Sequence, residues 1–419
     1  MNRIYGCIDL KSFFASAECA ERGLDPFKTN LVVADPERNE GTICLAVTPA
    51  MKKLGVKNRC RLYEIPKNID YIIAKPRMKL YMRKSAEIYS IYLKYIAPED
   101  IHVYSVDECF FDFTDYLKLY GKTPEELSKM LREAVFAQTG IRAASGIGTN
   151  LFLAKVALDI TAKHSEDFTG FLDEETFKKT IWHHRPITDV WNVGAGIAAR
   201  LAVYGIYDLY GVAHCHEDLL YKEFGVNAEL LIDHANGIEP CTIADIKAYK
   251  AKSASVSNSQ ILFSDYTKEE GFTVLKEMVY GQVLEITEKE LVTDSVSLYI
   301  GFADKSPKPA GGTTKLAEYT SSYKKIMEKF TELYERFVPE RQKIRKITVG
   351  LNNLVPNDYT VYDLFSSPEK DEKESVMQKT VLDIKNKFGK NAILKGTSFE
   401  PKATQRERKK MVGGHNGGE

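Results

Sequence analysis

The segment YSVDECFF (residues 104–111) places two carboxylates, Asp107 and Glu108, side by side in a run that otherwise favours a buried strand. Burying an unpaired carboxylate costs free energy, so a basic side chain, a metal ion or water at a strand end must meet these groups. The flanking runs 101–106 and 109–115 are rich in β-forming residues, which predicts a hairpin with the acids at or near its turn. On these residues alone, a solvated turn is the more ordinary alternative.

A third carboxylate ends another predicted strand. The run RIYGCIDL (3–10) is apolar and β-rich and carries Asp9 near its end. In an antiparallel sheet this end can lie beside the hairpin, so three carboxylates would share one patch. They cannot all ionise there without cations. Their hard oxygen ligands suit Mg²⁺, or Mn²⁺ as an alternative, and two such ions about 3.5–4 Å apart form the arrangement used for nucleotidyl transfer.

The bulk properties set wider limits. A chain of 419 residues is too long for one core, so two to four compact units are expected. The net charge of zero indicates no particular partner and does not exclude nucleic acid. Seven scattered cysteines without a CxxC motif predict a reducing, cytoplasmic location. No apolar run reaches the length of a membrane span, and the N-terminal residues do not resemble a signal peptide.

The order of predicted elements is that of an α+β multidomain protein. Strands and helices alternate up to residue 168, and one helix is signalled strongly over 123–140 by Thr123, Pro124 and Gly140. A helix, glycine hairpin, helix pattern follows at 187–213, and a second α/β unit spans about 250–352. Residues 366–419 have the composition of a partly helical, partly disordered tail.

Four segments resemble, in order and spacing, motifs of the Y-family DNA polymerases, the translesion enzymes. The resemblance covers residues 1 to about 355 and is greatest to the bacterial ImpB/MucB/SamB or UmuC-like branch, in its Gram-positive phage and plasmid versions. The four segments are CIDLKSFFASAE (7–18), YMRKSAEIY (81–89), YSVDECFFDFT (104–114) and ASGIGTNLFLAKVALD (144–159).

This resemblance implies a right-hand polymerase. The expected divisions are a palm at 1–22 and 75–167, fingers at 23–74, a thumb at 168–245, a DNA-binding little finger at 250–355, and a clamp-binding-like segment with a flexible tail at 356–419. Asp9 and Asp107 would bridge two Mg²⁺ ions, Glu108 would complete the shell of the catalytic ion, and the carbonyl of Leu10 would bind the nucleotide-bound ion.

The resemblance also suggests nucleotide contacts. Phe14 stands at the position of the family's steric gate, the aromatic ring that rejects a 2′-hydroxyl, with Phe13 beside it against the sugar and phosphates. Core aromatic residues are the alternative. Lys52 and Lys163 are candidate triphosphate contacts, with solvated lysines as the alternative. Two departures affect them: Pro49 stands near the family's tyrosine position, and the helix before Lys163 carries one extra residue.

Two further regions suggest contacts with DNA. The segment 190–206 resembles a helix-hairpin-helix, in which Gly194 and Gly196 would leave backbone N–H groups free for a phosphate. A packed helical hairpin is the alternative. In the segment that opens the little finger, Lys250, Lys252 and Ser253 are candidate phosphate contacts.

The segment YTVYDLFSS (359–367) resembles the peptide by which family members bind the sliding clamp, with Leu364 and Phe365 as anchors. A segment that packs on its own domain is the alternative. Together these features predict a template-directed, low-fidelity DNA polymerase for translesion synthesis, with primer-template DNA, dNTP and the clamp as partners. Two alternatives remain: a non-catalytic DNA-binding accessory protein on the same fold, and another two-metal enzyme such as a nucleotide cyclase.

Overall fold

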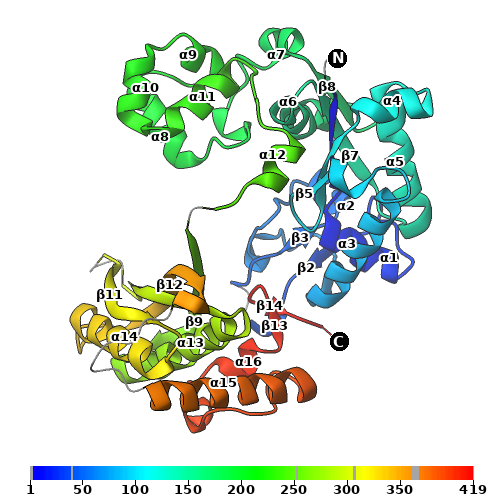
Figure 1. Ribbon diagram of the computed structural model, residues 1–419. Helices are drawn as coiled ribbons and strands as arrows, with labels where there is room; N and C mark the ends of the chain where they lie inside the picture. Colours follow the sequence, from blue (N-terminus) through cyan, green and yellow to red (C-terminus); the bar gives the residue numbers. More distant parts are fainter. Residues whose placement is uncertain (1–2, 39–40, 252, 305–307, 360–367, 419) are drawn as a thin grey trace. The chain divides into compact units, whose positions relative to one another are not determined.

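The computed structural model describes residues 3–38, 41–251, 253–304, 308–359 and 368–418 (Figure 1). The chain divides into two compact units, Met1–Tyr249 with Asn416–Glu419, and Lys250–His415. Both units combine sheets with helices, which confirms the predicted α+β multidomain class. The finer division into palm, fingers and thumb stays a prediction. No helix in the described ranges has the length and apolar character needed to cross a membrane.

The first unit is built around a five-stranded sheet in the order β5-β6-β1-β7-β8. Its central strand β1 runs antiparallel to both β6 and β7, while β8 is parallel to β7. The strands are β1 (Tyr5–Leu10), β5 (Ile101–Val103), β6 (Glu108–Asp112), β7 (Ala143–Gly148) and β8 (Thr169–Leu172).

Side chains alternate along β1, and this alternation decides on which side of the sheet Asp9 lies. Ile8 and Leu10 enter the larger core, with α1, α3 and α5. Tyr5 and Cys7 enter the opposite core, against α6, and Asp9 shares their side of the strand because side chains alternate. The helices around the sheet are α1 (Phe13–Glu21), α3 (Met78–Tyr92), α4 (Thr114–Tyr120), α5 (Pro124–Thr139) and α6 (Leu151–Val156), which continues as a π-helical segment (Ala157–Thr161).

The helix predicted over 123–140 is present as α5, and the residues that predicted its ends act as caps. The Thr123 hydroxyl accepts from the Glu126 backbone N–H at 3.2 Å, and the Glu126 carboxylate accepts from the Thr123 N–H at 2.9 Å. Pro124 follows the cap, and Gly140 ends the helix at φ 70°. Thr123, Glu126 and Pro124 satisfy or remove backbone donors that the N-terminal end leaves unpaired, and the Gly140 N–H donates to the Phe136 carbonyl at the other end.

Two smaller parts complete the first unit. A three-stranded sheet in the order β3-β2-β4 has its own core and carries α2. A helical part follows β8 and packs around a third core. The elements are β2 (Leu31–Val33), β3 (Ala46–Val47), α2 (Pro49–Lys53), β4 (Ile72–Ala74), α7 (Glu174–Thr180), α8 (Ala195–Val203), α9 (Leu209–Ala213), α10 (Glu217–Phe224), α11 (Asn227–Ala235) and α12 (Ile243–Ala248).

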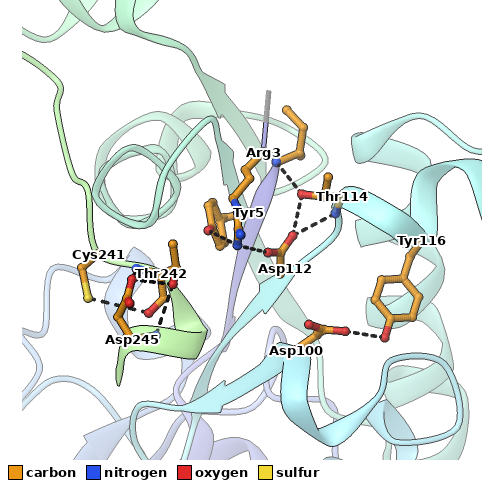
Figure 2. A network of polar contacts seen from close by, with 10 residues as sticks. Arg3, Tyr5, Asp100, Asp112, Thr114, Tyr116, Cys241, Thr242 and Asp245 are labelled. Carbon is orange, nitrogen blue, oxygen red and sulfur yellow. Dashed lines mark hydrogen bonds and ion pairs between the residues drawn. The ribbon is translucent and has the colours of Figure 1, made fainter. Parts of the chain in front are cut away.

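Helix α12 returns to the five-stranded sheet. Its Ile243 is buried in the same core as Tyr5 of β1, and Figure 2 shows α12 beside β1 and β6. Nearby, the Arg3 guanidinium donates to Asp112 at 3.1 Å, and Asp112 accepts from the Thr114 N–H at 3.0 Å. These bonds hold the ends of β1 and β6 that lie away from Asp9.

The second unit has a four-stranded sheet in the order β11-β10-β12-β9, with two long helices over one face. All three strand pairs are antiparallel. The elements are β9 (Ala254–Tyr266), α13 (Lys268–Glu288), β10 (Leu291–Phe302), β11 (Ala310–Thr320), α14 (Tyr323–Phe337) and β12 (Ile344–Pro356).

The structure corrects one expectation and extends another. The first helix expected before the glycine hairpin is only a 3₁₀ turn (Ile187–Asp189), and the residues after it lead directly to α8. The tail, expected to be partly helical and partly disordered, contains a long helix as expected, and its described residues 368–418 form further regular elements after it. The elements are α15 (Pro368–Phe388), a 3₁₀ turn (Gly396–Phe399), α16 (Gln405–Arg408), β13 (Met411–Val412) and β14 (His415–Asn416).

Candidate active site

The pairing of β1 with β6 brings the predicted acids together. Asp9 and Glu108 are direct cross-strand partners. Asp107 precedes Glu108 in the hairpin turn, and its backbone carbonyl accepts from the Leu10 N–H at 2.9 Å. The Ser105 hydroxyl donates to the Asp107 carboxylate at 2.7 Å, which fixes the turn. Three carboxylates from two distant segments therefore meet at one end of two neighbouring strands.

The electrostatics of Asp9 reflect this crowding. Burial, together with the negative charges of Asp107 and Glu108, raises the pKa of Asp9 to about 7. Both causes disfavour the ionised carboxylate, because burial removes its water and the neighbouring carboxylates repel its charge. A divalent cation at this position would reverse both.

Glu108 has a positive partner that the sequence did not reveal. The Lys155 ammonium of α6 lies 2.7 Å from the Glu108 carboxylate and 3.1 Å from Asp159, four residues along the helix. The Cys7 thiol donates to the same Glu108 oxygen at 3.0 Å. Lys155 and Glu108 are 7% and 8% exposed, so this is a buried ion pair. The available signal was one lysine inside the apolar run LFLAKVALDI, at a spacing of four from an aspartate.

The donor set fits Mg²⁺. Three carboxylates and the Leu10 carbonyl are hard oxygen ligands, and the raised pKa of Asp9 indicates negative charge that lacks compensation. Within the described ranges, no group of three acidic, histidine or cysteine side chains is already arranged around one point as metal ligands. The Glu108 carboxylate faces Lys155.

Lys11, Lys52 and Lys163 form a group of cations that influence one another, and two of them respond to the charge of Asp9. Burial lowers the pKa of Lys11 and of Lys52; the charge of Asp9 opposes this shift, and the charge of Lys163 adds to it. Lys52 and Lys163, expected from two separate segments, therefore lie close enough to influence each other, and Lys52 also lies close enough to be influenced by Asp9. The π-helical segment Ala157–Thr161 lies just before Lys163 and takes up one residue more than an α-helical turn would.

The two phenylalanines after Asp9 differ. Phe14 is half-buried and stacks on Tyr81, with ring centres 4.6 Å apart and an interplanar angle of 19°. The Tyr81 hydroxyl in turn donates to the buried Glu18 at 2.7 Å. Phe13 is only 2% exposed and belongs to the core, as in the alternative of a core aromatic residue, and its contact with a nucleotide stays a prediction.

The glycine hairpin leaves open backbone. Gly194 is the N-cap of α8 and makes no side-chain cap bond. A Cβ built on either Gly194 or Gly196 would meet nothing within 4 Å. Residues 194–196 are exposed, and the first N–H groups of a helix have no acceptor within the helix, so the N–H groups at this end can meet a ligand.

Among the described residues, the helices that pack on the second unit's sheet, α13 and α14, cover one face, and no helix covers the other. Lys346 is opposite Ile261 of β9 and Gly301 of β10 in the strand register, and Ile261 is 71% exposed. The hydroxyls of Ser259 and Thr348 lie 2.9 Å apart on this face. Lys250 and Ser253 are exposed just before β9. Three expected contacts, Lys252, Leu364 and Phe365, lie outside the described residues.

Comparisons with known proteins agree with this geometry. The model of the impB/mucB/samB family matches residues 8–159, and that of the C-terminal domain of the same family matches 253–364. The chain belongs to the impB/mucB/samB family of Y-family DNA polymerases. The recognised family is thereby confirmed.

Individual relatives cover nearly the whole chain. DNA polymerase IV 2 of Bacillus subtilis (strain 168) is 31% identical over 97% of this chain and 97% of its own length. A Bacillus subtilis (strain 168) relative named as a UV-damage repair protein, UvrX, is 30% identical over 98% and 96%. A solved chimaeric Y-family DNA polymerase, made from Dbh and Dpo4, is similar in fold, with a TM-score of 0.65 and 20% identity over 84% of this chain and all of that one.

Proposed function

We propose that this protein is a template-directed DNA polymerase of the translesion type, which adds a dNTP to a primer 3′-hydroxyl with two Mg²⁺ ions. The observation that carries the proposal is the meeting of Asp9, Asp107 and Glu108 at one end of β1 and β6. Lys52 is influenced by the charge of Asp9 on one side and by the charge of Lys163 on another. Carboxylates for metal ions beside cations for a polyphosphate are the parts that nucleotidyl transfer needs.

Each group has a distinct task in this proposal. Asp9, Asp107, Glu108 and the Leu10 carbonyl would hold the ions, which when bound lower the pKa of the primer hydroxyl and neutralise the departing pyrophosphate. Lys52 and Lys163 would bind and orient the triphosphate, since fixed cations stabilise negative charge without reorganisation.

Phe14 would form the floor beneath the nucleotide sugar and exclude a 2′-hydroxyl. Its stacking on Tyr81 supports this role, because a ring held from behind cannot move aside for an added hydroxyl. The buried Glu18 fixes Tyr81 from the other side.

Contacts with primer-template DNA would come from two places. The open backbone at Gly194 and Gly196 suits one phosphate. The uncovered sheet face, with its hydroxyls and Lys346, suits the backbone of a duplex. Binding to a sliding clamp and a cytoplasmic location remain expectations from the sequence.

The test is primer extension with Mg²⁺ on undamaged and abasic templates. We expect Asp107→Ala and Glu108→Ala to lose activity on the order of 10³-fold or more while DNA binding persists, because each removes a metal ligand. Asp115→Ala, which removes an exposed carboxylate on α4, is the matched control. If the unaltered protein binds primer-template but extends nothing, the accessory-protein alternative replaces this proposal.

A further inference from the structure

The C-terminal part of the second unit is strongly basic. Residues 385–410 contain nine lysines and arginines against two glutamates, in a chain whose net charge is zero. The segment begins beyond residue 364, where the match to the family's C-terminal domain ends. A local excess of this size attracts a polyanion.

This segment is folded against the helical layer of the second unit. The buried Glu277 of α13 accepts from the backbone N–H groups of Thr404 at 2.8 Å and Gln405 at 3.0 Å, where α16 begins. The Thr273 hydroxyl of the same helix donates to Glu400 at 2.8 Å. Because these bonds fix the segment, its cations are held in place before any ligand arrives, and less ordering entropy is lost on binding.

Two ammonium groups converge within it. Lys385 and Lys409 both donate to the backbone carbonyl of Lys390, at 3.1 and 2.8 Å. Across the described ranges, neither lysine has a carboxylate within ion-pairing distance. Burial and the nearby positive charge of Lys385 together lower the pKa of Lys409 to about 7. An anion between the two ammonium groups would relieve this repulsion.

The same segment follows the outer strand of the sheet. The Lys402 ammonium donates to Ser264 at 2.7 Å, and the Arg408 guanidinium donates to Asn258 at 3.2 Å. Both partners belong to β9, which forms one edge of the sheet (Figure 1). The basic segment thus extends the surface of the unit beside β9.

We propose that residues 385–410 form a second DNA-binding surface, in which Lys385 and Lys409 together bind one phosphate of the duplex backbone. The ligand is a phosphodiester, since paired ammonium donors match its two free oxygens and read no base. The inference rests on the proposed function, which supplies the DNA. It adds a contact outside the matched family domains.

The experiment measures how DNA affinity depends on salt. The full chain is titrated with a fluorescein-labelled primer-template of arbitrary sequence between about 50 and 200 mM KCl. For Lys385→Gln with Lys409→Gln, we expect weaker binding and a plot of log affinity against log salt that is shallower by about 0.9, the value for one lost phosphate contact. Lys373→Gln with Lys379→Gln, two exposed lysines on α15, is the matched control and should leave the slope unchanged.

Two further readouts keep the outcome clear. The Lys385→Arg with Lys409→Arg variant retains both charges and should restore the slope, which separates loss of charge from misfolding of the segment. A slope equal to that of the unaltered protein in the glutamine variant, or an equal loss in the control, overturns the inference. Single-turnover dNTP insertion at saturating DNA should be unchanged in every variant; absence of insertion in the unaltered protein would refute the proposed function instead.

Discussion

Lys155 is the residue whose removal should most disturb the acids. It is buried with Glu108, and its ammonium also contacts Asp159. In Lys155→Met the Glu108 carboxylate stays buried without its cation, and removing one partner of a buried pair costs about 3–5 kcal/mol. We therefore expect a lower melting temperature in thermal unfolding without metal.

Mg²⁺ gives this prediction a second readout. Added Mg²⁺ should raise the melting temperature of Lys155→Met more than that of the unaltered protein, because the freed carboxylate gains most from a cation. Lys163→Met, which removes an exposed lysine from the same helical run, should melt normally. Equal melting of both variants would contradict a counter-ion role for Lys155.

Asp9 predicts a pH dependence of stability without metal. Its pKa is about 7 in the folded protein, against 3.8 as the ordinary value. The folded state therefore binds more protons than the unfolded state between these values. The stabilising contribution is complete below pH 3.8 and is lost as pH rises through about 7, by roughly 1.4 kcal/mol for each pH unit between the two values.

The measurement compares the unfolding free energies of the unaltered protein and Asp9→Asn in EDTA from pH 5 to pH 8. The asparagine variant is neutral throughout, so the difference between the two should grow with pH and then level off above about 7. A difference that stays constant across this range would show that Asp9 keeps an ordinary pKa.

The acids of the candidate site were predictable because each stands out against its neighbours in the sequence. Asp107 and Glu108 stand out because two adjacent carboxylates interrupt an apolar run, and Asp9 because it ends one. Lys155 was not predictable, since its partner comes from a distant strand. Phe13 and Phe14 are adjacent aromatics, and only the packing of α1 shows that Phe13 is the buried one.

At the scale of elements, the π-helical segment is the feature with functional consequences. The extra residue before Lys163 left its direction open in the sequence, because one residue turns an α-helix by about 100°. We infer that the segment Ala157–Thr161 accommodates that residue, because a π-helical turn holds one residue more than an α-helical turn. The charge of Lys163 contributes to the lowered pKa of both Lys11 and Lys52. Backbone hydrogen-bond patterns of this kind depend on packing and leave no periodic signal in a sequence.

Lys52 on α2 and Lys163 after the π-helical segment should act together on the nucleotide. We expect Lys52→Ala and Lys163→Ala each to raise the KM for dNTP by roughly tenfold, the effect of about 1.4 kcal/mol of lost charge-assisted binding. The double variant should lose less than the product of the two effects, because the lysines share one phosphate chain. Steady-state extension with a single dNTP measures both. An unchanged KM in both single variants would leave them as solvated lysines.

For the glycine hairpin, the sequence identified the glycines but not the length of the element before them. Gly194 and Gly196 could be recognised because a Gly-x-Gly before an apolar helix is a strong local signal. The expected helix before it is a single 3₁₀ turn, Ile187–Asp189, and Pro186 precedes that turn. Proline fixes the backbone at the start of a short element and does not determine how far the element extends.

At the scale of the whole chain, length predicted several units and the order of elements predicted an α+β class, and both hold. Composition did not predict the fold of residues 368–418, because lysine- and glutamate-rich sequence signals a solvated tail. The structure anchors this region through single buried groups on α13, of which Glu277 is one. A buried acid in one helix and its partners more than a hundred residues later cannot be paired by composition.

The uncovered face of the second unit's sheet supplies the last prediction. Lys346 of β12 and Lys315 of β11 are both exposed, and the strand register places them on the face away from α13 and α14. If this face follows a duplex, each lysine neutralises one backbone phosphate. Lys346→Gln and Lys315→Gln should then each make the salt dependence of primer-template binding shallower by about 0.9.

Catalysis at the acids of the first unit gives the contrast that makes this prediction specific. At saturating DNA, the rate of single-nucleotide insertion should not change in either variant, whereas the number of nucleotides added per binding event should fall because the complex dissociates sooner. Lys324→Gln on α14 removes the same charge from the helix-covered side and should alter neither property. Equal effects from Lys324→Gln and Lys346→Gln would mean that net charge alone controls DNA binding, and the open sheet face would lose its assigned role.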